Sequence, residues 1–206
     1  MNFRRLAGLA LALVLAACSG ILPKPAAPPA LFRLTAASDF PAAASLRPIQ
    51  LAVAPPSAEA ALDTTRIALS RSPTTLDYFA DAAWTDRLPA LLQARLVDSF
   101  ANAHRLVALA GEASVAHSDA VLVIAVRHFE AQYDGGNGPP LWRIELSADL
   151  VGTGDRKVIA TRTFTGEAPA PQNNMAAIVE AADQAWHGVA KEIVDWAADS
   201  LANRPR

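Results

Sequence analysis

Three stretches in the second half of the chain alternate apolar and polar residues with a period of two, which is typical of β-strands that lie on a core. Residues 141–151 alternate most regularly, with one apolar and one polar face. The apolar face would consist of Trp142, Ile144, Leu146, Ala148 and Leu150. Residues 121–131 begin with an unbroken apolar run, which predicts burial on both faces near the start. Residues 157–165 follow a Gly-rich turn at 152–155, and a loop of glycines and prolines at 134–140 separates the first two stretches. These patterns predict an antiparallel meander.

Shorter alternating segments predict further strands in the first half of the chain. Residues 31–35, 49–53 and 106–109 are strand candidates bounded by loops or prolines. Residues 66–79 alternate on both sides of a Ser-Pro turn signal and predict a hairpin. A helix that begins within residues 76–84 is an alternative that the pattern leaves open.

Two other stretches repeat apolar residues every three or four positions, the spacing of an amphipathic helix. The first follows Thr85 and Asp86, which are typical of a helix start, and Pro89 is compatible only with a first turn. The second, longer helix follows Asn173 and Asn174, which can cap it. The two apolar stripes are Leu88, Leu91, Leu92, Leu96 and Phe100, and Ile178, Ala182, Trp186, Val189, Ile193 and Trp196.

These elements together indicate an α+β fold. We expect a mainly antiparallel sheet of about seven short strands, with the two amphipathic helices packed on one face. No internal repeat is recognisable in the sequence.

Residues 1–17 have the order of an export signal. Arg4 and Arg5 precede an unbroken apolar run at 6–17. That run is too short to span the hydrocarbon core of a membrane, which is about 30 Å thick. The run ends in Leu-Ala-Ala-Cys, which resembles the bacterial lipobox, with cleavage between Ala17 and Cys18 and attachment of lipid to the Cys18 thiol. A plain secretory signal with an incidental cysteine is the alternative.

The remaining chain divides into a tether and a domain. Residues 18–30 contain four prolines and several alanines, so we expect a semi-extended tether after the lipidated Cys18. Residues 31–206 are long enough for one domain. Cys18 is the sole cysteine, so no thiol remains for a disulfide. Without residues 1–17 the chain carries 16 basic and 20 acidic residues, a charge of −4 that does not suit nucleic acid.

The sequence has no recognisable catalytic or metal-binding motif. Its four histidines, His104, His117, His128 and His187, lack the spacing of metal ligands. The glycines of loop 134–140 match no nucleotide-binding pattern. Glu145 and Asp149 share the polar face of one strand, but nothing nearby distinguishes an acid from a base. We therefore expect no enzyme, no metal and no cofactor.

Tryptophans are more often core residues than binding residues. Trp142 differs from the other three because it adjoins the loop at 134–140. It is therefore a candidate anchor at a partner interface.

The middle third of the chain carries a family resemblance. Residues 66–69, residues 76–89 with Trp84, Asp86 and Pro89, and the pair Leu92–Gln93 resemble the ABC-type transport auxiliary lipoproteins, which include the paraquat-inducible protein C lipoproteins. The segment from Phe129 to Tyr133 and the pair Leu150–Val151 also look like this family. The likeness covers nearly all of residues 31–200.

The resemblance implies a non-catalytic periplasmic lipoprotein, anchored by its lipid to the outer membrane. Its partner would be the MCE-domain substrate-binding protein of an ABC transporter, and indirectly the permease and the ATPase. Such systems move phospholipids or other hydrophobic molecules between membranes. Ser19 after the lipidated cysteine fits outer-membrane sorting, because Asp is the usual retention residue there.

The sequence leaves two alternative functions and the oligomeric state open. An envelope assembly or scaffold lipoprotein without a transporter would have the same tether and domain. A periplasmic enzyme would need a site that carries no recognised motif. The sequence also leaves open whether copies of the chain form a homo-oligomer.

Overall fold

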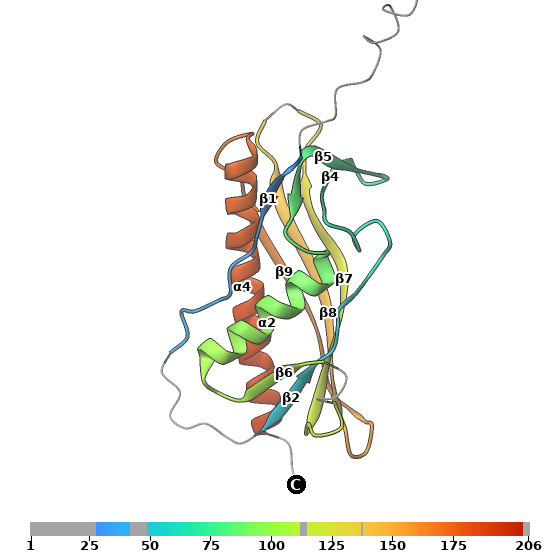
Figure 1. Ribbon diagram of the computed structural model, residues 1–206, viewed down its shortest axis with the longest axis vertical. Coiled ribbons are helices and arrows are strands. Elements are labelled where there is room, and N and C mark those ends of the chain that lie inside the picture. Colours follow the sequence, from blue (N-terminus) through green and yellow to red (C-terminus); the bar gives the residue numbers. More distant parts are fainter. Residues whose placement is uncertain (1–27, 42–48, 112–114, 137, 204–206) are drawn as a thin grey trace, which may run out of the picture.

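The computed structural model describes residues 28–41, 49–111, 115–136 and 138–203. The predicted export signal, Ala17, Cys18 and most of the predicted tether lie outside the described residues. Within the described part, two helices lie on one face of a large twisted sheet (Figure 1). The α+β class predicted from the sequence is therefore confirmed.

The sheet is organised around β7 (Ala120–Gln132). One edge of β7 pairs antiparallel with β8 (Leu141–Gly152), which in turn pairs antiparallel with β9 (Val158–Pro169). This confirms the predicted meander. The other edge of β7 meets three short strands in succession, all of them parallel to it: β2 (Gln50–Val53), β3 (Ser57–Ala58) and β4 (Arg66–Ser72).

Three further strands extend the sheet. β5 (Thr75–Trp84) pairs antiparallel with β4, so residues 66–79 form the predicted hairpin and the alternative helix does not occur. β1 (Ala30–Phe32) is parallel to β5, and β6 (Val107–Ala110) is parallel to β2. The sheet thus has nine strands among the described residues, and most of its paired residues are antiparallel because the two longest pairings, β7–β8 and β8–β9, are antiparallel, while the short strands add parallel pairs.

In β8 and in the first part of β7, the side chains on the face covered by the helices are the buried ones. The residues of β8 alternate between buried and half-buried along the whole strand, and its predicted apolar face is the buried one. The start of β7 also alternates, and the Val123 side chain is 41% exposed. The prediction that this apolar run is buried on both faces was wrong, because both helices cover the same face of the sheet and leave the other uncovered.

Both predicted helices are present, but only α4 begins where the sequence predicts. α2 (Leu88–Ala103) has Pro89 in its first turn, as predicted, but its N-cap is Arg87, and no side chain caps it. Thr85 and Asp86 lie just before the helix, so their predicted role as helix start was wrong by two residues. α4 (Met175–Ala202) is capped by Asn174, whose side-chain oxygen accepts from the Ala177 N–H at 3.0 Å, as predicted.

The two helices pack on different parts of the sheet and against each other. α4 lies along β8 and β9, and α2 crosses over β2 and β6. α4 lies close to β9 at Gly166, where an added Cβ would lie 2.9 Å from the Ala185 carbonyl oxygen and 2.6 Å from Val189 Cγ2. In the described residues no helix combines the length and apolarity of a membrane span.

Candidate functional site

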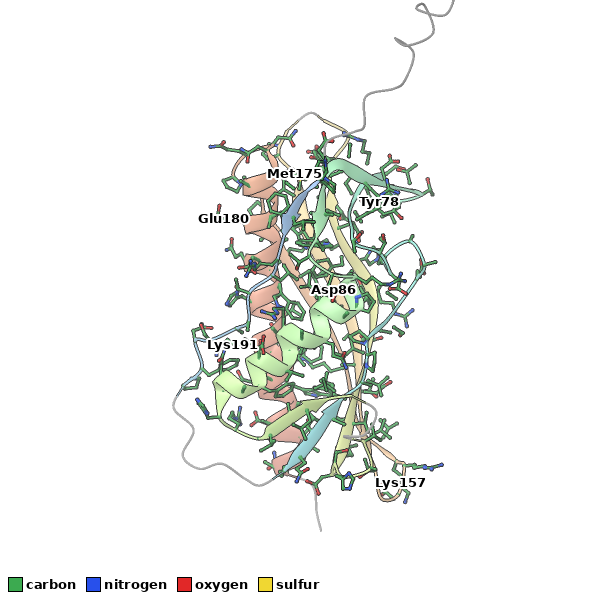
Figure 2. All side chains as sticks on the ribbon, viewed as in Figure 1. Tyr78, Asp86, Lys157, Met175, Glu180 and Lys191 are labelled. Atoms are coloured by element: carbon green, nitrogen blue, oxygen red, sulfur yellow. The ribbon has the colours of Figure 1, made fainter. Side chains whose placement is uncertain are left out.

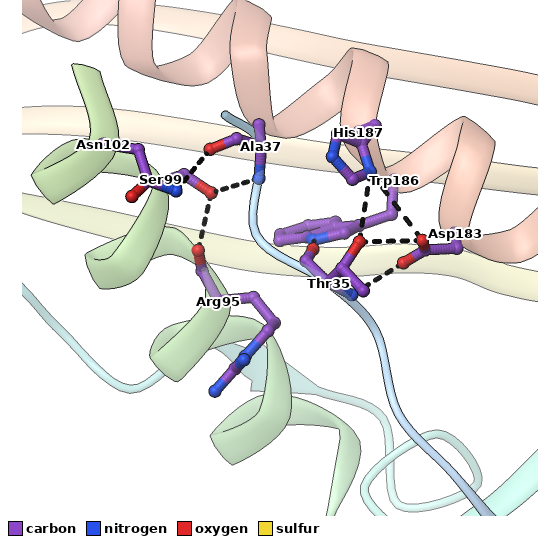
Figure 3. Close-up of polar contacts among 8 residues, drawn as sticks. All are labelled: Thr35, Ala37, Arg95, Ser99, Asn102, Asp183, Trp186 and His187. Carbon is purple, nitrogen blue, oxygen red and sulfur yellow. Dashed lines mark hydrogen bonds and ion pairs between the residues drawn. The ribbon is translucent and has the colours of Figure 1, made fainter. Parts of the chain in front are cut away.

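The segment that follows β1 lies between the two helices (Figure 3). Leu34 and Ala37 of this segment are completely buried, and Phe40 is partly buried against the same core. The segment has no regular secondary structure, so its backbone N–H and C=O groups need partners elsewhere. Side chains of both helices provide them, and we call segment 33–41 with these side chains the N-terminal clamp.

On the α4 side, Asp183 and Trp186 hold Thr35. The Thr35 N–H donates to Asp183 Oδ1 at 2.7 Å, and its hydroxyl donates to Asp183 Oδ2 at 2.8 Å. Trp186 Nε1 donates to the Thr35 carbonyl oxygen at 3.1 Å. His187 Nδ1 lies 3.4 Å from the Thr35 hydroxyl. Both main-chain groups of Thr35 are therefore bonded to one face of α4.

On the α2 side, two polar side chains bind Ala37. Ser99 is completely buried, and its Oγ accepts from the Ala37 N–H at 3.0 Å while it donates to the Arg95 carbonyl at 2.6 Å. Asn102 Nδ2 donates to the Ala37 carbonyl at 2.9 Å. The main chain of residues 35–37 is thus bonded to α4 at one residue and to α2 two residues later.

A lysine of α4 extends the clamp beyond these bonds. Lys191 Nζ donates to the Asp39 carbonyl at 2.9 Å and lies 4.7 Å from the centre of the Phe40 ring. A tension on the chain before residue 30 would act first on the pairing of β1 with β5 and then on the bonds that join the clamp to both helices. No local pattern indicates the clamp, because its partners are 62 to 152 residues apart in the sequence.

A second candidate site is a groove of about 720 Å³ on the sheet face away from the helices. The β4–β5 hairpin and the loop after β3 form its walls, and β7 and β8 form its floor. We call it the outer groove. Its ionisable lining residues are Glu59, Arg71, Arg127, His128, Glu130, Asp134 and Arg143.

Glu130 is the buried carboxylate of the outer groove, with 4% of the residue exposed. Its Oε2 accepts from the Phe129 N–H at 2.7 Å, and its Oε1 lies 2.9 Å from His128 Nδ1 and accepts from Gln132 Nε2 at 3.3 Å. A buried carboxylate is costly unless it is bonded in this way. Glu130 therefore orients His128 and does not present a free charge to the groove.

The arginines of the groove differ in their partners. Arg143 pairs with Glu145 at 3.0 Å. The Arg71 guanidinium lies 4.7 Å from the centre of the Tyr133 ring, and Arg127 is exposed; within the described residues neither makes an ion pair. Burial raises the pKa of Tyr133, and the Arg71 charge partly opposes that rise. The Tyr133 hydroxyl donates to Asn173 Oδ1 at 2.8 Å.

Trp142, the candidate interface anchor, lies in the core. Only 1% of it is exposed, and its ring forms edge contacts with Trp84 and Phe129 at centroid distances of 6.0 and 5.4 Å. The inward face of β8 buries it, because Trp142 has the same parity as Ile144 and Leu146. In this structure Trp142 is therefore a packing residue and is not at the surface.

The other polar residues considered from the sequence remain apart. Glu145 pairs with Arg143, and Asp149 accepts from the Thr161 hydroxyl at 2.5 Å. In the described residues no group of three or more His, Cys, Asp or Glu side chains is placed to hold a metal ion.

The chain matches a protein family over most of its length. The model of the family described as "ABC-type transport auxiliary lipoprotein component" matches residues 32–194. An uncharacterised protein of Bradyrhizobium diazoefficiens is 35% identical over 158 residues, which are 76% of this chain. This chain spans 41% of the length of that protein.

Solved structures share the fold. The crystal structure of protein XCC0632 from Xanthomonas campestris, a DUF330 member, has a TM-score of 0.75 and 31% identity, and covers 84% of this chain and 97% of its own. A hypothetical protein of Chlamydia trachomatis has a TM-score of 0.51 and 9% identity, with 76% of this chain and 100% of its own covered, and shows likeness of fold alone.

Proposed function

The chain belongs to the family of ABC-type transport auxiliary lipoprotein components, and on this premise we propose that it is the non-catalytic, lipid-anchored component of an MCE-type transporter. In this role it stands on the periplasmic side of the outer membrane. It docks the MCE-domain substrate-binding protein, and through it the permease and the ATPase. The transported molecules are phospholipids or other hydrophobic molecules.

The family match over residues 32–194 is the observation that carries this proposal. It includes the clamp residues Thr35, Ser99 and Asp183, so the whole unit that holds the N-terminal segment lies inside the matched region. The family description names a transport auxiliary component and no catalytic activity. The resemblance in residues 66–93 is the reason for choosing an MCE-type system among ABC transporters.

The N-terminal clamp supports an anchored role. A lipid on Cys18 would connect to the domain through the chain that enters at β1. Bonds from Asp183, Ser99 and Asn102 then hold that chain to both helices. An anchor attached in this way leaves the domain from one fixed point, so the same end of the domain is always the one joined to the membrane.

The test is capture of the partner from membranes. The full-length lipoprotein, tagged at its C-terminus, is purified from detergent-solubilised membranes in a strain in which an MCE-domain protein is expressed at a measured level. We expect the MCE-domain protein to be recovered with it. A matched strain with Cys18→Ala, in which the protein is not anchored, reports how much recovery depends on co-localisation.

Failure to recover an MCE-domain protein that is demonstrably present would count against the transporter assignment. It would favour the envelope scaffold, the alternative that shares the tether and the domain. Recovery of the partner by both forms would show that docking depends on the domain surface and not on the anchor.

A further inference from the structure

We propose that the outer groove binds the headgroup of a zwitterionic phospholipid, with Arg71 and Arg127 on the phosphate. The proposal rests on the proposed function in one respect, which is that the domain is held at a membrane. Nothing in the family match assigns a ligand to this groove. The location of the groove, its free cations and its acids each support the proposal.

The groove lies toward the end of the domain at which the chain would come from the membrane. β1, the first described strand, begins at Ala30, which pairs with Ala82 of β5. The β4–β5 hairpin, which walls the groove, is at that same end, whereas Lys157 and the last turns of α4 are at the opposite end (Figures 1 and 2). A tether of about 13 residues at about 3 Å each would keep this end within roughly 40 Å of the bilayer.

Two cations in the groove are available to a ligand. Among the described residues no carboxylate pairs with Arg71 or Arg127. The Tyr133 ring holds the Arg71 guanidinium from one side at 4.7 Å, so the guanidinium is positioned without using its N–H donors on an acid. Arginine N–H groups match phosphate oxygens in geometry and in charge.

Hydroxyl groups stand beside these cations. Ser72, Thr74 and Thr75 all line the groove at the tip of the β4–β5 hairpin. Ser72 Oγ lies 2.9 Å from Thr75 Oγ1. Hydroxyls of this kind donate readily to a phosphate oxygen.

The acids of the groove determine the kind of headgroup. Glu130 is buried and its oxygens face the Phe129 N–H, Gln132 and His128, so they do not compete with a phosphate for the groove arginines. Glu59 and Asp134 line the same groove and are exposed. A headgroup with a phosphate and an ammonium, as in phosphatidylethanolamine, uses both signs of charge, whereas inorganic phosphate or a purely anionic headgroup would meet these acids unfavourably.

Binding to vesicles by the full mature chain with Cys18→Ala tests the proposal, because the lipid anchor is then absent. The vesicles contain phosphatidylethanolamine and phosphatidylcholine, and the comparison vesicles consist of an uncharged galactolipid without phosphate. Bound protein is measured by flotation. The groove variant is Arg71→Gln with Arg127→Gln, and the control is Arg156→Gln with Lys157→Gln, the same loss of charge at the opposite end of the domain.

We expect binding to phospholipid vesicles, little binding to galactolipid vesicles, and a decrease of about tenfold or more in the groove variant. The control variant should bind as the unsubstituted chain does. Millimolar inorganic phosphate should not displace the protein from the vesicles. Circular dichroism and the urea midpoint establish that both variants are folded.

Equal binding by the groove variant and the control, or no binding to phospholipid vesicles, would overturn the proposal. Binding of inorganic phosphate alone, measured by calorimetry and lost in the groove variant, would overturn the assignment to a lipid and indicate a site for free phosphate. These outcomes leave the capture of an MCE-domain protein by the lipidated chain unaffected, so the two proposals fail separately.

Discussion

Both donors of Thr35 are bound by the carboxylate of Asp183, which is 148 residues further along the chain. The N–H and the hydroxyl take one carboxylate oxygen each, at 2.7 and 2.8 Å. The pair joins the segment after β1 to the first half of α4. If the N-terminal segment transmits the pull of a lipid anchor, this bond is one of the places where the pull reaches the folded domain.

We predict that Asp183→Ala lowers the free energy of unfolding by about 1–3 kcal/mol, because the Thr35 N–H and hydroxyl lose a charged acceptor. Urea denaturation measures the loss, and hydrogen exchange at the Thr35 amide should become faster. Glu180→Ala on the same helix is the matched control, because Glu180 is exposed (Figure 2). Its replacement should change stability by no more than about 0.5 kcal/mol. Equal effects of both replacements would contradict the role of the bond.

Two glycines should respond to alanine in opposite directions. In Gly166→Ala the new methyl group would lie 2.9 Å from the Ala185 carbonyl oxygen, which belongs to a helix backbone and cannot move alone. We expect a loss of about 1–3 kcal/mol in thermal unfolding. Gly188→Ala has open space around the added atom and lies within α4. A gain of about 0.5–1 kcal/mol is expected there.

If Gly166→Ala proves neutral, β9 and α4 do not approach each other as closely as the structure places them. Adding Val189→Ala to Gly166→Ala should restore part of the stability, because Val189 Cγ2 is the other close atom, at 2.6 Å.

Trp142 should behave as a core residue, because it packs beside Trp84 and Phe129. Trp142→Ala is expected to lower the free energy of unfolding by about 3–5 kcal/mol, since it opens a cavity there. Trp142→Phe keeps a ring and removes an indole N–H that has no hydrogen-bond partner among the described residues. It should therefore cost only about 1–2 kcal/mol. Guanidinium denaturation compares the two. Unchanged stability in Trp142→Ala with loss of partner binding would instead indicate an interface residue.

Tyr133 should make stability depend on alkaline pH. Burial raises its pKa in the folded protein above the ordinary value of 10.0. The folded state therefore holds this proton more tightly than the unfolded state does. The contribution of protonated Tyr133 to the free energy of unfolding is fully present below pH 10.0 and is lost as the pH rises through the pKa of Tyr133 in the folded protein.

A titration of tyrosine absorbance measures this ionisation directly, and the chain has two tyrosines. When the absorbance titration of Tyr133→Phe is subtracted from that of the unsubstituted protein, the remaining ionisation step, which belongs to Tyr133, should lie above pH 10.0. The replacement also removes the bond to Asn173. Tyr133→Phe should therefore lose about 1 kcal/mol at neutral pH. A difference step at or below pH 10.0 would contradict the buried environment.

Replacement of the predicted lipid attachment residue should change location and leave the fold intact. We expect most of Cys18→Ala to leave the outer-membrane fraction, because a charge of −4 gives the domain no electrostatic attraction to an anionic surface and headgroup binding by the outer groove alone is reversible. Sucrose-gradient fractionation measures the distribution, and the circular dichroism spectrum should not change. Sedimentation of the variant with outer membranes that persists when Arg71 and Arg127 are also replaced by Gln would mean that neither the lipid nor the outer groove is what holds it there.

Local patterns in the sequence were enough to predict several elements. The alternation along residues 141–151 identified the buried face of β8, since neighbouring side chains of a strand point to opposite faces. The stripe from Ile178 to Ile193 and the cap at Asn174 identified α4. The family could also be recognised, because its pattern lies in contiguous residues of the middle third.

Tertiary structure decided the features that depend on residues far apart in the chain. The sequence alone determined the α+β class, the meander, both helices and the absence of catalytic motifs, since each is a property of a local window. The parallel pairing of β2, β3 and β4 with one edge of β7 has no local signature, because parallel neighbours are joined by long connections. Likewise, only the fold brings Thr35 to Asp183 and encloses Glu130 in the outer groove. The reason is that burial is set by what packs on a face and not by the residues beside it in the chain.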